Sequence, residues 1–253
     1  MTRNIKRSDE LEGTMRYSMY IGKVMGVPLL INISLILALP LYALVFGVAF
    51  FDVSGFPIGL GRSTYDLYGK MILGAFLAIF LFFAILLHEL GHVWAAKHKG
   101  YQVTSVTLFF AGGVSEMDHT KDWPRGEAEV AITGALLSIV VGLALLSIYY
   151  LVRGGLAGWA ETFAAIVLSG FGLLNLFLGV MNALPILPMD GGLVLRDLLR
   201  YDLGLARASE VTIFISRAVA LLMVAVGIFL LNWVIILAGV VLLLTIDPRQ
   251  LGR

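Results

Sequence analysis

Long apolar runs separated by short polar stretches dominate this chain of 253 residues. Such runs predict membrane-spanning helices, because about 20 apolar residues are needed to cross the roughly 30 Å hydrocarbon core of a bilayer. We expect five spans, at about 29–51, 71–96, 130–152, 162–187 and 211–231. The last apolar run, 233–246, would reach only about 21 Å as a helix, and we include it as a sixth, shorter span.

The stretch 101–117 departs from this pattern, because it is too short to cross a membrane as a helix. It is rich in Val, Thr and Phe and contains Gly112-Gly113, which favours a β-hairpin over 103–116. A further short strand is expected over 17–21 at the membrane surface. The predicted fold class is therefore an all-α polytopic membrane protein of about six transmembrane helices. It carries a small membrane-associated β-hairpin or sheet near the cytoplasmic face.

Composition agrees with a multi-pass membrane protein, since 59% of the residues are hydrophobic and 14% are charged. The net charge is +1 and there is no basic stripe, so we expect no nucleic-acid partner. The absence of cysteine excludes disulfides, thiolate zinc ligands and a cysteine nucleophile. The apolar stretch after the polar N-terminal residues is too long for a signal peptide, so we expect no cleaved signal.

The distribution of Lys and Arg predicts the orientation in the membrane. With six spans and both termini inside, fifteen of the 18 basic residues are cytoplasmic, and only Arg62, Lys70 and Arg153 lie outside. We therefore expect a multi-pass protein of the cell membrane with cytoplasmic N- and C-termini. The expected organisation is a single transmembrane domain, 1–253, made of a cytoplasmic N-terminal segment 1–26, a membrane core 27–247 and a short C-terminal tail 248–253.

The second apolar run ends in the sequence His88-Glu89-Leu90-Gly91-His92. Two histidines four residues apart lie on one face of a helix, so both imidazoles can reach one metal ion. Glu89 is turned about 100° from His88. It can take a proton from a water molecule whose pKa zinc lowers to about 7. This pattern is typical of zinc metalloproteases, and shuffling the chain would produce it roughly 0.0015 times.

Two histidines do not complete a catalytic zinc site, which takes three protein ligands and an open position for water. Asp190 is the best candidate, because it follows the fourth span and lies near the same face of the membrane. Prolines before it break the helix, and two glycines after it let the chain turn closely past the metal. The alternative third ligands lie in more polar stretches: His98, Glu116, Asp118 and His119. The two extra histidines are expected to be solvated surface residues.

Three motifs together resemble the site-2 proteases, which are intramembrane zinc metalloproteases. They are L-L-H-E-L-G-H at 86–92, A-G-G-V at 111–114 and N-x-x-P-x-x-P-M-D-G-G at 182–192. The segment 22–32 also looks like the part of the family that precedes its first span. The resemblance covers nearly the whole chain, from about residue 17 to residue 247.

The resemblance implies one zinc ion per chain, bound by His88, His92 and Asp190, with Glu89 as the general base. Asn182 matches a family asparagine that assists near the scissile carbonyl as an oxyanion donor. The segment 134–138 lacks the Pro and Asn of the family, which weakens any role for that segment but leaves the metal site intact. Nor is there room for the PDZ or CBS domains of some members, so the chain is expected to be a minimal form. Its control would come from its membrane part or from a regulatory membrane partner.

One further asparagine, Asn175, has no match in the family. We expect it to form a hydrogen bond between helices.

The function this predicts is hydrolysis of a peptide bond within a transmembrane segment of a membrane protein, as in regulated intramembrane proteolysis. The hairpin at 103–116 either accepts the unwound substrate as an added strand or plugs the cytoplasmic opening. An intramembrane metal-ion transporter is the alternative, although it would predict ligands at mid-membrane and repeated halves. A third possibility is an inactive member that only binds membrane proteins.

Overall fold

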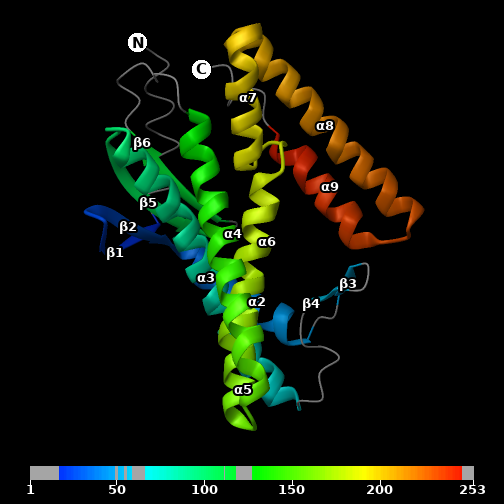
Figure 1. The fold of residues 1–253 in the computed structure, drawn as a ribbon. Coiled ribbons are helices and arrows are strands. Elements are labelled where there is room, and N and C mark those ends of the chain that lie inside the picture. The colour runs from blue at the N-terminus through cyan, green and yellow to red at the C-terminus, as the bar shows by residue number, and fades with distance from the viewer. Residues whose placement is uncertain are drawn as a thin grey trace. The chain divides into compact units, whose positions relative to one another are not determined.

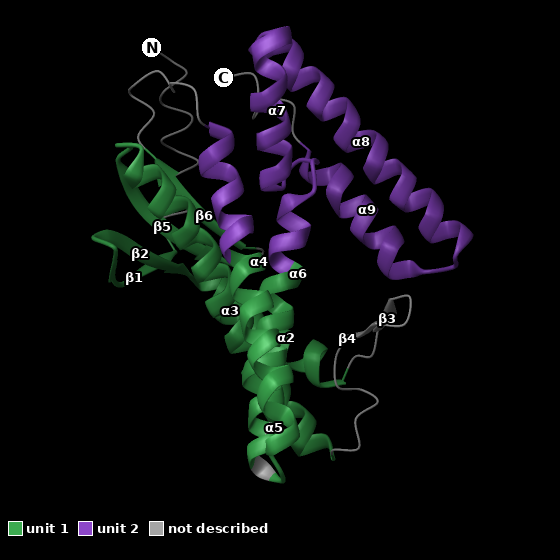
Figure 2. Ribbon diagram, in the orientation of Figure 1, with its two compact units in different colours: residues 1–118, 138–177 green, residues 119–137, 178–253 purple. Residues whose placement is uncertain are grey.

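The computed structural model describes residues 17–48, 51–53, 56–58, 66–110, 112–117 and 127–246. These residues are mainly helical and include a small sheet (Figure 1). The chain divides into two compact units (Figure 2): unit 1 is Met1–Asp118 with Ser138–Phe177, and unit 2 is His119–Leu137 with Leu178–Arg253. The predicted C-terminal tail 248–253, residues 1–16 of the N-terminal segment, and the alternative ligands Asp118 and His119 lie outside the described residues.

The sheet belongs to unit 1 and contains both predicted β regions. Its strands are β1 (Ser18–Val24), β2 (Val27–Asn32), β5 (Val103–Phe109) and β6 (Gly112–Met117), in the order β1-β2-β5-β6. The outer pairs are antiparallel and the central pair, β2 with β5, is parallel. Two shorter strands, β3 (Phe51–Val53) and β4 (Phe56–Ile58), pair with each other. The hairpin predicted over 103–116 and the strand predicted over 17–21 are thus confirmed.

The first predicted span begins later than expected. The prediction of a helix from residue 29 was wrong, because β2 continues to Asn32 and helix α2 covers Ile33–Val48. A continuous apolar run does not distinguish a buried strand from the start of a buried helix. The Asn32 side chain marks the change, since its Oδ1 accepts a hydrogen bond from the Ser34 amide at 3.0 Å, as an N-cap does.

Helix α3 (Leu67–His98) follows and carries the histidine motif near its C-terminal end. The Asp66 side chain caps it by accepting a hydrogen bond from the Gly69 amide. The sheet packs against this helix through β5 and β6 (Figure 1). The β1–β2 turn is also held there, because Lys97 donates a hydrogen bond to the Met25 carbonyl. Unit 1 thus places the hairpin and the motif side by side.

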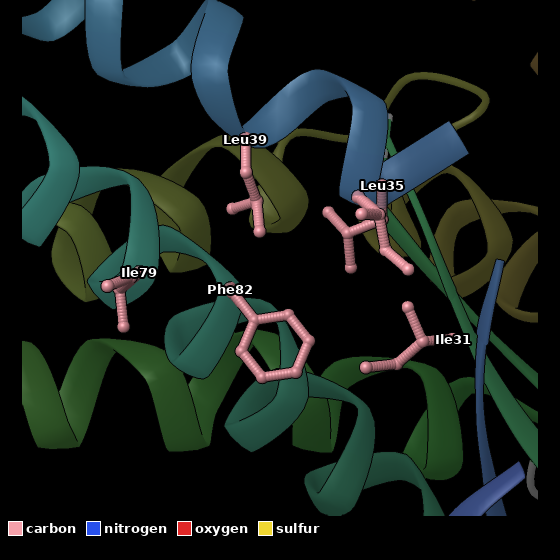
Figure 3. A pocket seen from close by; sticks show the side chains of 6 residues that line it. Ile31, Leu35, Leu39, Ile79 and Phe82 are labelled. Atoms are coloured by element: carbon pink, nitrogen blue, oxygen red, sulfur yellow. The ribbon is translucent and has the colours of Figure 1, made fainter. Parts of the chain in front are cut away.

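An apolar pocket of about 200 Å³ lies between α3 and the β2–α2 region of unit 1 (Figure 3). Its lining is Ile31, Leu35, Ile36, Leu39, Ile79 and Phe82. The side chains labelled in Figure 3 turn only hydrocarbon toward the space between the two helices. Since it offers neither a charge nor a hydrogen-bonding side chain, this pocket carries no chemistry.

The next helices are α4 (Glu127–Val152), α5 (Trp159–Ala164), a π-helical turn (Ala165–Gly170) and α6 (Phe171–Ala183). The unit boundaries fall inside α4 and α6. The prediction that the fourth span continues to residue 187 was wrong, because α6 ends at Ala183. Pro185 explains the difference, since a proline disfavours the helical conformation of the residue before it.

The remaining helices belong to unit 2 and are α7 (Asp190–Leu203), α8 (Leu205–Phe229) and α9 (Trp233–Thr245). Gly204, with a φ of +75°, separates α7 from α8, so α8 begins well before the predicted start at residue 211. The loop before α7 is anchored on α8 and α9. Ile186 packs with Ala220 and Leu242, and the Leu187 amide donates to the Ser216 hydroxyl at 2.8 Å.

Four helical segments of the described residues are long and apolar enough to cross a bilayer: Leu67–His98, Glu127–Gly155, Ala165–Ala183 and Leu205–Phe229. The two shorter apolar helices, α2 and α9, have 16 and 13 residues. The protein is therefore a mainly helical, multi-pass membrane protein with a small sheet.

Candidate metal centre

The last turns of α3 bring the three residues of the histidine motif together. His88, Glu89 and His92 are buried, with exposed fractions of 5%, 6% and 8%. The Nε2 atoms of the two histidines face each other at 3.2 Å, and the rings are nearly perpendicular at 86°. The predicted convergence of the two imidazoles is therefore present within one helix of unit 1.

The spacing of these nitrogens suits two ligands of one zinc ion. Zinc–nitrogen bonds of about 2.05 Å at a tetrahedral angle place two ligand nitrogens about 3.3 Å apart. The observed Nε2–Nε2 distance of 3.2 Å matches this value. Both nitrogens can bind a metal only when they carry no proton, which puts the proton of each neutral ring on Nδ1.

Ser138 of α4 lies against the outer nitrogen of His88. Its hydroxyl oxygen is 3.2 Å from His88 Nδ1, and the serine is fully buried. In the tautomer that leaves Nε2 for a metal, Nδ1–H donates to this hydroxyl and holds the ring in orientation. The sequence alone assigned no function to Ser138, so this contact with His88 was not predicted. Only the rotation of α4 about its axis brings Ser138 to His88, and sequence spacing does not report that rotation.

Strand β6 holds the carboxylate of Glu89. The Ser115 hydroxyl donates a hydrogen bond to Glu89 Oε2 at 2.7 Å. A Cβ added to Gly113 would lie 2.3 Å from Glu89 Cγ, so only a glycine allows the strand to approach this closely. Gly113 of the A-G-G-V motif therefore has a physical role, whereas the contact of Ser115 was not predicted.

Asp190 is the first residue of α7 and is half-buried in unit 2. The prediction that Gly191 and Gly192 form a turn past the metal was wrong, because both lie in the first helical turn. A Cβ on Gly191 would lie 2.3 Å from the Leu184 carbonyl oxygen, and one on Gly192 would lie 2.6 Å from the backbone of Ile186. The two glycines thus let α7 pack directly on the backbone that precedes it.

Asn182 lies in the unit 2 part of α6, where its side-chain amide donates to the Leu178 carbonyl at 2.9 Å. Asn175 bonds in the same way to the Phe171 carbonyl at 2.9 Å, so the predicted hydrogen bond to another helix is replaced by one within α6. Its side chain is nevertheless fully buried.

The described alternative ligands have other partners. His98 is exposed and stacks on Trp94 with ring centroids 5.5 Å apart, as expected of a surface residue. Glu116 Oε2 accepts a hydrogen bond from Ser105 at 2.8 Å. The two histidines belong to unit 1 and Asp190 belongs to unit 2, and the structure describes each unit separately. The joining of all three at one metal therefore stays a prediction.

Comparison with known proteins gives several relatives. A zinc metalloprotease of Methanocaldococcus jannaschii is 32% identical over 225 residues, which are 89% of this chain and 58% of the relative. A putative zinc metalloprotease of Synechocystis sp. is 32% identical over 73% of this chain and 45% of the relative. The chain thus spans about half the length of these curated relatives.

Among solved structures, the site-2 protease from Methanocaldococcus jannaschii matches with a TM-score of 0.61 and 29% sequence identity. The match covers 94% of this chain and 96% of that one. The sequence profile of Peptidase family M50 matches residues 76–167 and 157–226. Since these segments make up more than half of the chain, the protein belongs to Peptidase family M50, and the resemblance of its motifs to the site-2 proteases is confirmed.

Proposed function

We propose that this protein is a zinc-dependent endopeptidase that cleaves a peptide bond within a transmembrane segment of another membrane protein. The observation that carries the proposal is the pair of buried histidine Nε2 atoms 3.2 Å apart, together with the buried Glu89 that follows His88 on the same helix. The names of the two relatives, a zinc metalloprotease and a putative zinc metalloprotease, agree with it. Membership of Peptidase family M50 supports the same reaction class.

The proposed ligands of one zinc ion per chain are His88, His92 and Asp190. The donor set of two imidazoles and a carboxylate is one that catalytic zinc uses, with a position left for water. Asp190 stands at the start of α7, whose first turn is packed on the preceding backbone through Gly191 and Gly192. Support for its part in the site comes from the family motif and from the close packing of its backbone on the preceding residues.

A zinc ion held there would act as a Lewis acid that lowers the pKa of bound water to about 7 and polarises the scissile carbonyl. Glu89 accepts a proton from the attacking water and returns it to the leaving amine. The hydrogen bond from Ser115 keeps the carboxylate in one orientation for both transfers. Ser138 does the same for the ring of His88.

Asn182 is proposed to donate a hydrogen bond to the carbonyl oxygen as negative charge develops on it. One such donor contributes a factor of about 10²–10³ in rate in a comparable site. In the structure its amide donates to the Leu178 carbonyl, so the side chain must rotate to serve a substrate. The support for this role is the family resemblance alone.

The proposed substrate is a transmembrane segment that unwinds near the cytoplasmic side, because a helix hides its amides in internal hydrogen bonds. Strand β6 is an edge of the sheet and directly contacts Glu89 through Gly113 and Ser115. An extended peptide added to this edge would lie next to the general base. Among the two proposed roles of the hairpin, this contact favours the acceptance of substrate over a plug. Besides the substrate, the proposed partners are the lipid bilayer and a membrane protein that regulates cleavage.

We also propose that α2 and α9 cross the membrane, which gives six spans and two cytoplasmic termini. As helices of 16 and 13 residues they are about 24 and 20 Å long, so strand and loop residues must complete the crossing. The fifteen-to-three distribution of basic residues supports this orientation. Under it, the whole chain is a single transmembrane peptidase domain built from both compact units.

Replacement of Glu89 by Gln is expected to lower cleavage by at least about 10²–10⁴-fold and to leave zinc bound, because the amide takes no proton. Mass spectrometry of membranes that contain the wild-type or the E89Q protein would reveal the substrate, and metal analysis would give the zinc content. Loss of zinc in E89Q would show that Glu89 is a ligand. Zinc uptake by proteoliposomes without any peptide cleavage would instead support a transporter.

Replacement of Ser115 by Ala is expected to lower kcat about tenfold with unchanged zinc content, because the Glu89 carboxylate loses the bond that orients it. Ser105→Ala is the matched control, since Ser105 lies in the same sheet and donates to Glu116 instead. Cleavage of the substrate found with E89Q would be timed for both variants. Equal rates for the two serine variants would contradict a role of Ser115 in orienting Glu89.

Replacement of Ser138 by Ala is expected to weaken zinc binding about 10–100-fold, because His88 loses the hydrogen bond that its other ring nitrogen makes. Ser147→Ala is the control on the same helix, because among the described residues the Ser147 hydroxyl donates to the Leu143 carbonyl of its own helix. Competition with a chromophoric chelator measures the affinity. A Ser138→Ala protein that binds zinc as tightly as Ser147→Ala would rule out this contribution.

A further inference from the structure

A buried cluster of charged side chains lies in unit 2, apart from the residues proposed to bind zinc. Arg196 and Asp197 of α7 have exposed fractions of 8% and 3%. Arg196 forms an ion pair with Glu127, the first residue of α4. Asp197 Oδ2 accepts a hydrogen bond from the Ala128 amide at 3.0 Å. These four residues, the α4–α7 clamp, fasten the start of α4 to the middle of α7.

Stability alone does not account for such a cluster. A buried ion pair is often no more stabilising than apolar side chains of the same volume, because both charges lose their hydration. Arg196 Nε is also buried without a hydrogen-bond partner among the described residues. Directional contacts between charged groups, however, specify one register and one rotation of two helices, which apolar contacts define less sharply.

The start of α4 is a specific partner for the Asp197 carboxylate. The first amides of a helix have no acceptor within the helix, and they carry a partial positive charge. Asp197 satisfies one of them from another helix, in the way that an N-cap side chain does from the same chain segment. The contact therefore depends on the rotation of α7 about its own axis.

That rotation decides where Asp190 points. Asp197 follows Asp190 by seven residues, which is about 700° of helical rotation, so the two side chains leave α7 only about 20° apart. At the other end of the same two turns, a Cβ on Gly191 would lie 2.3 Å from the Leu184 carbonyl oxygen. Any turning of α7 would thus break the clamp and change the packing of its first turn.

We propose that the α4–α7 clamp is a positioning device for Asp190 and thereby sets the affinity for zinc. The inference rests on the proposed function, in which Asp190 is the third ligand. The clamp residues act through α7 and bind neither metal nor substrate. The same helix α4 also carries Ser138, eleven residues after Glu127, and Ser138 contacts His88 within unit 1. Helix α4 therefore contacts His88 directly and also contacts α7, the helix that carries Asp190.

The test compares three replacements in α7 of the full-length protein. Asp197→Leu removes the acceptor for the Ala128 amide, while Asp197→Asn keeps a neutral one. Asp202→Leu is the matched control, because Asp202 is exposed at the end of the same helix. Zinc affinity would be measured by chelator competition well below the unfolding temperature. The visible spectrum of the Co²⁺-loaded protein would report the number and geometry of the ligands.

We expect Asp197→Leu to bind zinc about 10–100-fold more weakly than Asp202→Leu and to give a changed cobalt spectrum, with equal helical content. Asp197→Asn should keep most of the affinity. A merely structural cluster would lower the unfolding temperature of Asp197→Leu and leave the zinc affinity and the cobalt spectrum unchanged, which would overturn the proposal.

The wild-type protein and Asp190→Asn separate this inference from the proposed function. Zinc that binds tightly to the wild type, binds more weakly to Asp190→Asn and keeps its full affinity in Asp197→Leu would overturn the clamp alone. A wild-type protein that binds no zinc would overturn the clamp and the peptidase together.

Discussion

Two imidazole nitrogens that face each other at 3.2 Å inside an apolar helix are the constraint on which the rest of this structure depends. In the tautomers that leave both Nε2 atoms free for a metal, the two lone pairs repel each other, and ionisable groups within a membrane segment are costly unless they have a partner. A shared cation satisfies both lone pairs at once. The partners of the motif serve this arrangement, because Ser138 holds the outer side of His88 while Ser115 holds Glu89. Two of the proposed zinc ligands and the proposed general base thus lie within two turns of one helix.

The small sheet lies directly against the histidine motif. It brings strand β6 close to Glu89, and the approach is possible only because Gly113 has no side chain. That same strand is one of the two edge strands of the sheet, and β1 is the other. A protease that acts on membrane-spanning helices must hold an unwound peptide where backbone amides find partners, since lipid offers none. In the proposed function, strand β6 would offer such partners to the substrate next to Glu89, which it contacts through Gly113 and Ser115.

Local features of the site were predictable from the sequence, whereas contacts between elements were not. The helical spacing of His88 and His92 predicts their meeting, and the glycine-rich stretch predicts the hairpin. Ser138 and Ser115 were missed, because their roles depend on the rotation of α4 and on the register of β6. The first helix was placed too early because an apolar strand and an apolar helix have the same composition. The turn predicted at the glycines after Asp190 was wrong, because both the start of a helix and a turn accept small residues.

The central claim is that a zinc ion is bound by two imidazoles of α3 and the carboxylate of Asp190. X-ray absorption at the zinc edge of the purified protein tests it most directly, with the Asp190→Asn protein beside it. The account predicts two nitrogen ligands at about 2.0–2.1 Å with imidazole scattering, and the loss of a carboxylate oxygen at about 2.0–2.2 Å in the variant. Zinc without imidazole ligands, or an identical spectrum in the variant, would contradict it.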